Sequence, residues 1–168
     1  VLYQPDAAYL KAVKDIPRNQ YEEIITDIQE VYEALGSKEY TGVRLYEDAS
    51  YPLCKLYSLE TKQQELLHPK VWLKSGGFLV IEQGETLTAI DVNSGKNDKK
   101  ADICYATNLE AVHEIFRQIR ARNISGMILI DFINTTDASS LHSSIPRVRD
   151  EIKKDYVRCQ YIDMTGRG

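Results

Sequence analysis

The sequence has little that would place it in a membrane, in a disulfide framework or around a zinc ion. It has no run of about 18 apolar residues and no signal peptide, so we expect a soluble, cytoplasmic protein without a membrane span. Its 3 cysteines are far apart and its 3 histidines are isolated, which favours reduced thiols over disulfides or a zinc site. Cys159 lies in an alternating run and is predicted to be a small core residue.

The composition is that of an ordinary folded protein. The 168 residues are 43% hydrophobic and 27% charged, enough for one sizeable core or two small ones. The formal net charge of −4 argues against a protein that holds nucleic acid by overall positive charge. Residues 1–68 carry 7 Lys and Arg against 12 Asp and Glu, whereas residues 69–168 carry 14 against 13. We therefore expect a polyanion to bind the second half.

The first 68 residues are predicted to form an α-rich lobe. Helix formers, apolar residues spaced 3 and 4 apart, and a glycine at position 36 that would end a helix all point this way. The expected elements are helices at Ala7–Lys14, Gln20–Leu35 and Pro52–Leu67, with a strand within Tyr40–Tyr46.

From Val71 the sequence predicts a mixed β-sheet with packed helices, so the whole chain is expected to be α/β. Short β-type runs separated by glycine turns indicate an antiparallel meander. Thr107–Glu110 has the form of a capping box that opens a helix, and Met127–Ile133 is typical of a strand buried on both faces. The other expected elements are strands at Val71–Leu73, Phe78–Ile81, Leu87–Val92 and Val157–Asp163, and a helix within Ser139–Asp155 that Pro146 starts.

Two carboxylates, Asp91 and Asp131, lie inside these apolar strand runs. Burying an unpaired carboxylate is costly, and a hard divalent cation with oxygen ligands compensates two that converge. Asn93 points to the same face of its strand as Asp91 and could bond a ligating carboxylate or a substrate oxygen. Alternatively, both acids are capping or turn residues paired with Lys or Arg. Spacing alone leaves both interpretations open.

Four motifs together resemble the catalytic region of the ribonuclease E/G family, in the same order and at similar intervals. They are IDVNSG at Ile90–Gly95, TNLEA at Thr107–Ala111, IDFI at Ile130–Ile133 and DMT at Asp163–Thr165. The resemblance implies that residues 69–168 form a DNase I-like catalytic domain. It also implies that residues 1–68 correspond to the second part of an RNase H-like domain.

The resemblance further implies an endoribonuclease of RNA processing and decay that hydrolyses single-stranded RNA with Mg²⁺. Asp91 and Asp131 would hold the ion, with Asn93 beside them as a third catalytic residue. A carboxylate-bound Mg²⁺ stabilises charge on phosphoryl oxygens and lowers the pKa of an attacking water, which is what phosphodiester hydrolysis needs. Three nearby lysines are either a solvated loop or contacts to RNA phosphates: Lys96, Lys99 and Lys100.

The chain departs from the family at Asn134-Thr135, where the family commonly has an acid and Met, so a third carboxylate there is not expected. Without an initiator Met, and without the family's zinc-link cysteines and OB-type module, we expect a segment that is monomeric and weakly active by itself, from a homo-oligomeric parent. A non-catalytic RNA-binding or scaffolding domain of the same fold is the alternative function. A metal-dependent DNase is a weaker one.

Overall fold

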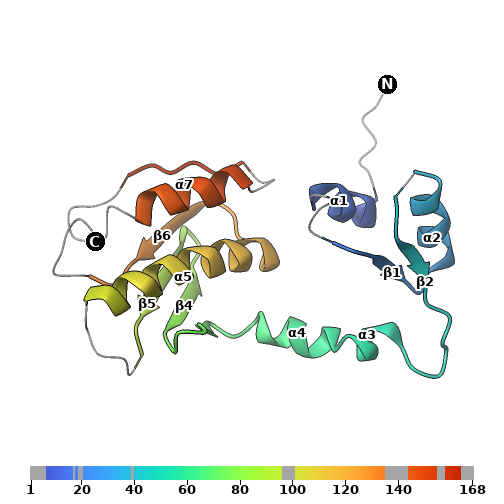
Figure 1. Cartoon of the computed structure of the whole chain (residues 1–168), viewed down its shortest axis with the longest axis horizontal. Helices are drawn as coiled ribbons and strands as arrows, with labels where there is room; N and C mark the ends of the chain where they lie inside the picture. The colour runs from blue at the N-terminus through green and yellow to red at the C-terminus, as the bar shows by residue number, and fades with distance from the viewer. Residues whose placement is uncertain are drawn as a thin grey trace. The chain divides into compact units, whose positions relative to one another are not determined.

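The computed structural model describes residues 7–16, 18, 21–38, 40–95, 101–134, 144–154 and 158–163. The chain divides into two compact units, Val1–Lys62 and Gln63–Gly168 (Figure 1). Each contains helices and strands, so the expected α/β class is confirmed. The assignment of residues 1–68 and 69–168 to two named domains stays a prediction. Among the described residues, no helix is both long enough and apolar enough to span a membrane.

The first unit combines short helices with a two-stranded sheet. Its strands run parallel, with Ile24 as the register partner of Val43. Leu10 and Leu35 are its buried apolar residues among those described, so the core of this unit is small. Its elements are α1 (Ala8–Asp15), β1 (Ile24–Thr26), α2 (Gln29–Gly36), β2 (Val43–Leu45), α3 (Leu53–Leu56) and α4 (Leu59–Glu65), the last of which crosses into the second unit.

The helix predicted over Gln20–Leu35 is wrong in its first half, because that part contains β1 and α2 begins only at Gln29. Adjacent β-branched residues favour a strand where a neighbouring strand can pair with them. The Thr26 hydroxyl then accepts a hydrogen bond from the Ile28 amide (3.1 Å), which turns the chain before the helix. Helical spacing of apolar residues was therefore overridden by a local strand pairing.

Other predictions in this unit fare better. The helix near Ala7–Lys14, the helix end at Gly36 and the strand within Tyr40–Tyr46 are confirmed. The helix expected after Pro52 is broken into α3 and α4 at Ser58, whose φ of 51° is outside the helical range.

The second unit is built on a four-stranded sheet in the order β3-β4-β5-β6. The expected meander is confirmed: β3 (Lys70–Trp72), β4 (Phe78–Gln83) and β5 (Leu87–Asn93) are antiparallel neighbours. The fourth strand, β6 (Met127–Asp131), pairs parallel with β5. Parallel neighbours need a long crossover, and α5 (Ala101–Ala121) supplies it.

One face of this sheet is covered by α5, and α7 (Ser144–Lys154) packs against α5 in turn (Figure 1). Alternate strand side chains point toward α5 and form the core with it. The buried members of this core are Leu73, Leu79, Ile81, Ile90, Val92, Ala111, Ile115 and Ile124.

The opposite face of the sheet, called here the open face, carries side chains that are exposed or half-buried. It corrects the expectation that β6 is buried on both faces, because exposed and half-buried residues alternate along that strand. Only its α5 side contributes to the core. The residues of the open face are Lys70, Trp72, Phe78, Val80, Glu82, Leu87, Ala89, Asp91, Asn93, Met127, Leu129 and Asp131.

Three further expectations need correction. Thr107–Glu110 does not cap a helix, because α5 begins at Ala101 and the motif lies in its middle. Residues 158–163 form no strand, since an alternating sequence pairs only where a neighbouring strand is available and none of the described residues pairs with it. Cys159 in that segment is exposed and is not a core residue. Pro146 does lie in the first turn of α7, as expected.

Candidate functional site

Asp91 and Asp131 are direct neighbours in the structure although forty positions separate them in the sequence. They are Cα register partners at the ends of the parallel strands β5 and β6, and adjacent strands lie about 4.8 Å apart. Register partners in a parallel pair point to the same side of the sheet, here the open face. The structure therefore brings together the two acids that the sequence singled out.

Both carboxylates are exposed, so the expectation that they are buried among apolar neighbours is wrong. The strands alternate, and their apolar residues turn toward α5 while the acids turn away. The alternative that each acid is paired with Lys or Arg finds no support, since no salt bridge of either is present among the described residues. What motivates a cation here is the convergence of the two charges, not their burial.

Asn93 lies on the open face two residues after Asp91. Its Nδ2 donates a hydrogen bond to Asp91 Oδ2 over 2.7 Å. The amide thereby fixes one carboxylate oxygen and leaves its own Oδ1 as an acceptor or a metal ligand. Lys96, Lys99 and Lys100, the predicted phosphate contacts, lie outside the described residues.

The chain segment just after Asp131 is held by Asn108 of α5. Asn108 Nδ2 donates to the carbonyl oxygen of Ile133 (3.0 Å), and the Ile133 amide donates to Asn108 Oδ1 (3.1 Å). Only 1% of the Asn108 surface is exposed. A buried side chain with both of its polar atoms bonded to one residue fixes the exit of β6, and with it the end of the strand that carries Asp131.

Glu110, two residues further along α5, holds the turn between β3 and β4. Its carboxylate accepts hydrogen bonds from the Lys74 amide (2.6 Å) and the Ser75 amide (3.1 Å). Partial burial alone would raise the pKa of Glu110, but the hydrogen bonds from Ser75 and Lys74 outweigh it and lower the pKa. The motif read as a capping box therefore joins α5 to two distant segments. Its TNLE spacing gave no signal of this role.

Glycines let the strand ends that carry Asn93 pack closely. A Cβ on Gly77 would lie 2.6 Å from the backbone oxygen of Asn93 and 2.9 Å from Thr107 Cγ2, nearer than real contacts allow. Gly95 has φ of +70°, a left-handed backbone conformation that glycine adopts readily. The start of β4 and the end of β5 are thus pressed together beside the candidate site.

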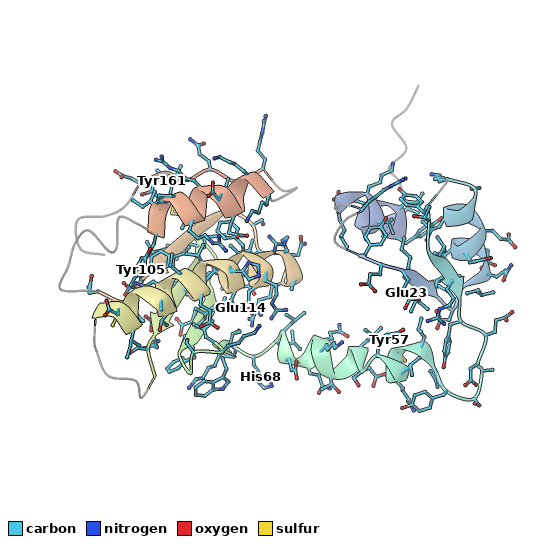
Figure 2. All side chains as sticks on the ribbon, viewed as in Figure 1. Glu23, Tyr57, His68, Tyr105, Glu114 and Tyr161 are labelled. Atoms are coloured by element: carbon cyan, nitrogen blue, oxygen red, sulfur yellow. The ribbon has the colours of Figure 1, made fainter. Side chains whose placement is uncertain are left out.

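Charged side chains on the polar side of α5 make an ion pair and hydrogen bonds within the second unit. Glu114, labelled on this helix in Figure 2, accepts from Arg117 Nη2 over 2.6 Å. Arg122 donates from Nε to Gln118 (2.7 Å) and from Nη2 to the carbonyl oxygen of His68 (2.7 Å). Arg117 and Arg122 thus make their described contacts within the second unit. A cavity of about 470 Å³ between β6, α5 and α7 has neither Asp91 nor Asp131 in its lining.

The donor set suits a hard cation with a partly water-filled shell. Two carboxylates and one amide oxygen on an exposed sheet end are the oxygen ligands that Mg²⁺ accepts while it keeps several waters. Among the described residues, no group of three or more His, Cys, Asp or Glu could hold a metal, so an all-protein cage is not present there. The residues at this position therefore fit Mg²⁺ and do not fit zinc.

The family model for ribonuclease E/G matches residues 1–168. The chain belongs to the ribonuclease E/G family. It is 34% identical over 171 residues to ribonuclease E of Escherichia coli strain K12, and 34% identical over 171 residues to ribonuclease E of Buchnera aphidicola subsp. Schizaphis graminum. Ribonuclease G of Escherichia coli strain K12 is 32% identical over 168 residues. The resemblance seen in the four motifs is thereby confirmed, and the family is one of endoribonucleases.

These alignments cover most of this chain and a small part of each relative. They take in 95% of the chain against 16% and 18% of the two ribonucleases E, and 94% of the chain against 34% of the ribonuclease G. The chain thus spans between about one-sixth and one-third of the length of these relatives.

Proposed function

We propose that this chain carries the hydrolytic centre of a Mg²⁺-dependent endoribonuclease that cuts single-stranded RNA, with Asp91 and Asp131 as the ligands of the ion. The observation that carries the proposal is the register pairing of these two acids on the open face. A family of endoribonucleases supplies the reaction class, and two converging carboxylates supply the site. A DNase I-like fold for residues 69–168 is part of the same proposal.

Each residue has a defined part in this proposal. Mg²⁺, when bound, would stabilise negative charge on the phosphoryl oxygens and acidify a water. Asp91 and Asp131 hold the ion, and the amide of Asn93 keeps one Asp91 oxygen oriented. Asn108 holds the backbone beyond Asp131 in place. Asp91 and Asp131 are exposed within the described part of the chain, which leaves room there for an extended single strand.

The test removes one carboxyl charge at a time. Asp91→Asn or Asp131→Asn should reduce cleavage of a 5′-phosphorylated single-stranded oligoribonucleotide in Mg²⁺ by at least about 100-fold, the order seen when one charge-stabilising group is lost. Products of the unchanged chain should carry 5′-phosphate and 3′-hydroxyl ends. Stability should not fall, because the substitution also relieves repulsion between neighbouring acids.

Glu82→Gln is the matched control. Glu82 is an exposed acid on the same open face, but its register partner is Ala89 and not a site residue. The Glu82→Gln variant should cleave RNA at the same rate as the unsubstituted chain. Cleavage that survives both aspartate substitutions would refute the proposal, and RNA binding without any cleavage would favour a non-catalytic RNA-binding domain instead.

A further inference from the structure

An aromatic pair lies on the open face, beside the candidate metal site. Trp72, the only tryptophan of the chain, is 65% exposed. Its ring meets that of Phe78 edge to face, with centroids 5.4 Å apart. A single exposed aromatic needs no explanation, but a paired aromatic surface on a sheet face that also carries the site residues is a candidate binding surface.

A lysine completes this cluster. Lys70 Nζ lies 4.1 Å from the centroid of the Trp72 ring and 3.7 Å from that of the Phe78 ring. The ammonium group is thus attracted to both rings, although Lys70 is an exposed residue. The cluster offers an exposed aromatic ring and a positive charge side by side, and these match the base and the phosphate of one nucleotide.

The sheet register fixes how this cluster lies relative to the site. Phe78 is the register partner of Asn93 on β5, the residue that bonds Asp91. Lys70 stands in the neighbouring row, which continues through Val80 to Asp91 and then to Asp131. Successive residues on one face of a strand are about 6.6 Å apart, so the two rows are separated by roughly the length of a nucleotide.

We propose that Trp72 and Phe78 form a base-stacking platform, with Lys70 as a phosphate contact, that binds a nucleobase of single-stranded RNA next to the bond to be cut. This inference rests on the proposed function and names residues that position its substrate. Every base has a π face, so such a platform grips RNA without selecting its sequence. Stacking also offsets the repulsion that the acids of the open face exert on phosphates. It gives a chain of net charge −4 a way to hold a polyanion.

The single tryptophan makes the platform directly observable. In EDTA, which prevents cleavage, a short single-stranded oligoribonucleotide is titrated into the unchanged chain while Trp72 fluorescence and the anisotropy of a label on the RNA are both recorded. Stacking should quench the fluorescence in step with binding. An abasic ribose-phosphate strand of the same length should bind more weakly and leave the fluorescence unquenched.

Substitutions of Trp72 distinguish the contribution of its aromatic ring to RNA binding from that of apolar surface alone. Trp72→Leu should weaken RNA binding about 5- to 100-fold, the range expected for the loss of one stacked base, whereas Trp72→Phe should stay close to the unchanged chain. Leu67→Ala, which removes a side chain 79% exposed and outside the sheet, is the control and should bind RNA normally. Circular dichroism should show the same fold in all three, because each position is exposed.

The outcomes distinguish the two proposals. Binding without quenching, together with unchanged affinity in Trp72→Leu, would overturn the platform and leave the nuclease proposal standing. Quenching in this chain, together with full cleavage by a full-length family member in which the residue matching Asp91 or Asp131 is replaced by Asn, would support the platform and refute the nuclease proposal. An oligonucleotide that does not bind at all, or a cluster that instead mediates self-association in sedimentation, would refute the platform.

Discussion

At the scale of single residues, Asn108 shows how much one buried side chain does for the site. We predict that Asn108→Ala lowers the free energy of unfolding by about 1–3 kcal/mol, since it strands the amide and carbonyl of Ile133. It should also reduce RNA cleavage, because the end of β6 loses its anchor. Urea unfolding followed by circular dichroism measures the first effect.

Asn108→Asp sharpens this prediction. The aspartate still accepts from the Ile133 amide, but its buried charge faces the Ile133 carbonyl oxygen, so at neutral pH its stability should be no higher than that of Asn108→Ala. Equal stability for all three chains would show that water replaces the Asn108 contacts and that the residue does not position Asp131.

Gly77 gives a second prediction at this scale. Gly77→Ala should destabilise the second unit by about 1–3 kcal/mol, the range for overpacking, because the new methyl group meets the Asn93 backbone and Thr107. Gly36→Ala is the control: nothing lies within 4 Å of a Cβ there, and an alanine at a helix end lowers the entropy of the unfolded chain. Thermal unfolding that shows no difference between the two variants would contradict the tight approach.

The sequence predicted which acids form the candidate site, but not their exposure or the residues that hold the neighbouring backbone. The two acids stood out as polar breaks in apolar strand runs, and their convergence follows the expectation. Their exposure was not predicted. In a strand with one covered face, alternate side chains are buried, and the sequence alone does not show which set faces the covering helix. Asn108 and Glu110 were misread, since a local capping motif and a pair of long-range hydrogen bonds have the same residue types.

At the scale of elements, side chains of α5 form hydrogen bonds with segments that are distant from it in the sequence. Glu110 near its middle holds the β3–β4 turn, and hydrogen bonds lower its pKa. A carboxylate whose folded pKa is lowered contributes stability above its ordinary pKa and loses that contribution as the pH falls through the lowered value. We predict that Glu110→Gln flattens the acid side of the stability profile, below the ordinary glutamate range.

Unfolding by urea at a series of acid pH values measures this effect. Glu82→Gln is again a suitable control, because its side chain is exposed and has no hydrogen bond within the described part of the chain. If both variants follow the acid limb of the unchanged chain, the contact between Glu110 and the turn contributes nothing to folding.

Elements were easiest to predict where one local signal dominated. Glycine turns between β-branched runs located the meander of β3, β4 and β5. The errors are places where neighbours decide: β1 forms because β2 pairs with it, and residues 158–163 stay irregular without a described partner. Both involve contacts that no window of sequence contains.

At the scale of the whole molecule, the two units differ in the size of their cores. Among the described residues, the first unit buries two apolar side chains, whereas the second has a continuous cluster on either side of α5. We predict that the first unit opens at a lower free energy, with the slowest amide hydrogen exchange in β4, β5 and the middle of α5. Equal protection of the two units, measured by mass spectrometry, would contradict this.

The isolated chain should also be a poor enzyme. We predict a monomer that binds Mg²⁺ weakly and turns over RNA far more slowly than a full-length family member, since two carboxylates alone hold Mg²⁺ loosely. Its net charge of −4 offers few phosphate contacts, and positioning of substrate can supply roughly 7–11 kcal/mol of barrier reduction. Sedimentation and parallel cleavage assays measure both properties. Turnover equal to that of ribonuclease E would show that this chain positions RNA unaided.

The parallel pairing of β5 with β6 makes the candidate site an indicator of correct strand alignment. A slip of β6 by a single residue would rotate Asp131 under α5 and bring an isoleucine or phenylalanine to the side of Asp91. Such a misaligned chain would retain its secondary structure and much of its compactness, yet it would present one carboxylate where two are needed. Under the proposed function, binding of a divalent cation would therefore report on alignment more sharply than circular dichroism does. A saturating concentration of the cation would then distinguish aligned from misaligned chains in any preparation that retains both aspartates.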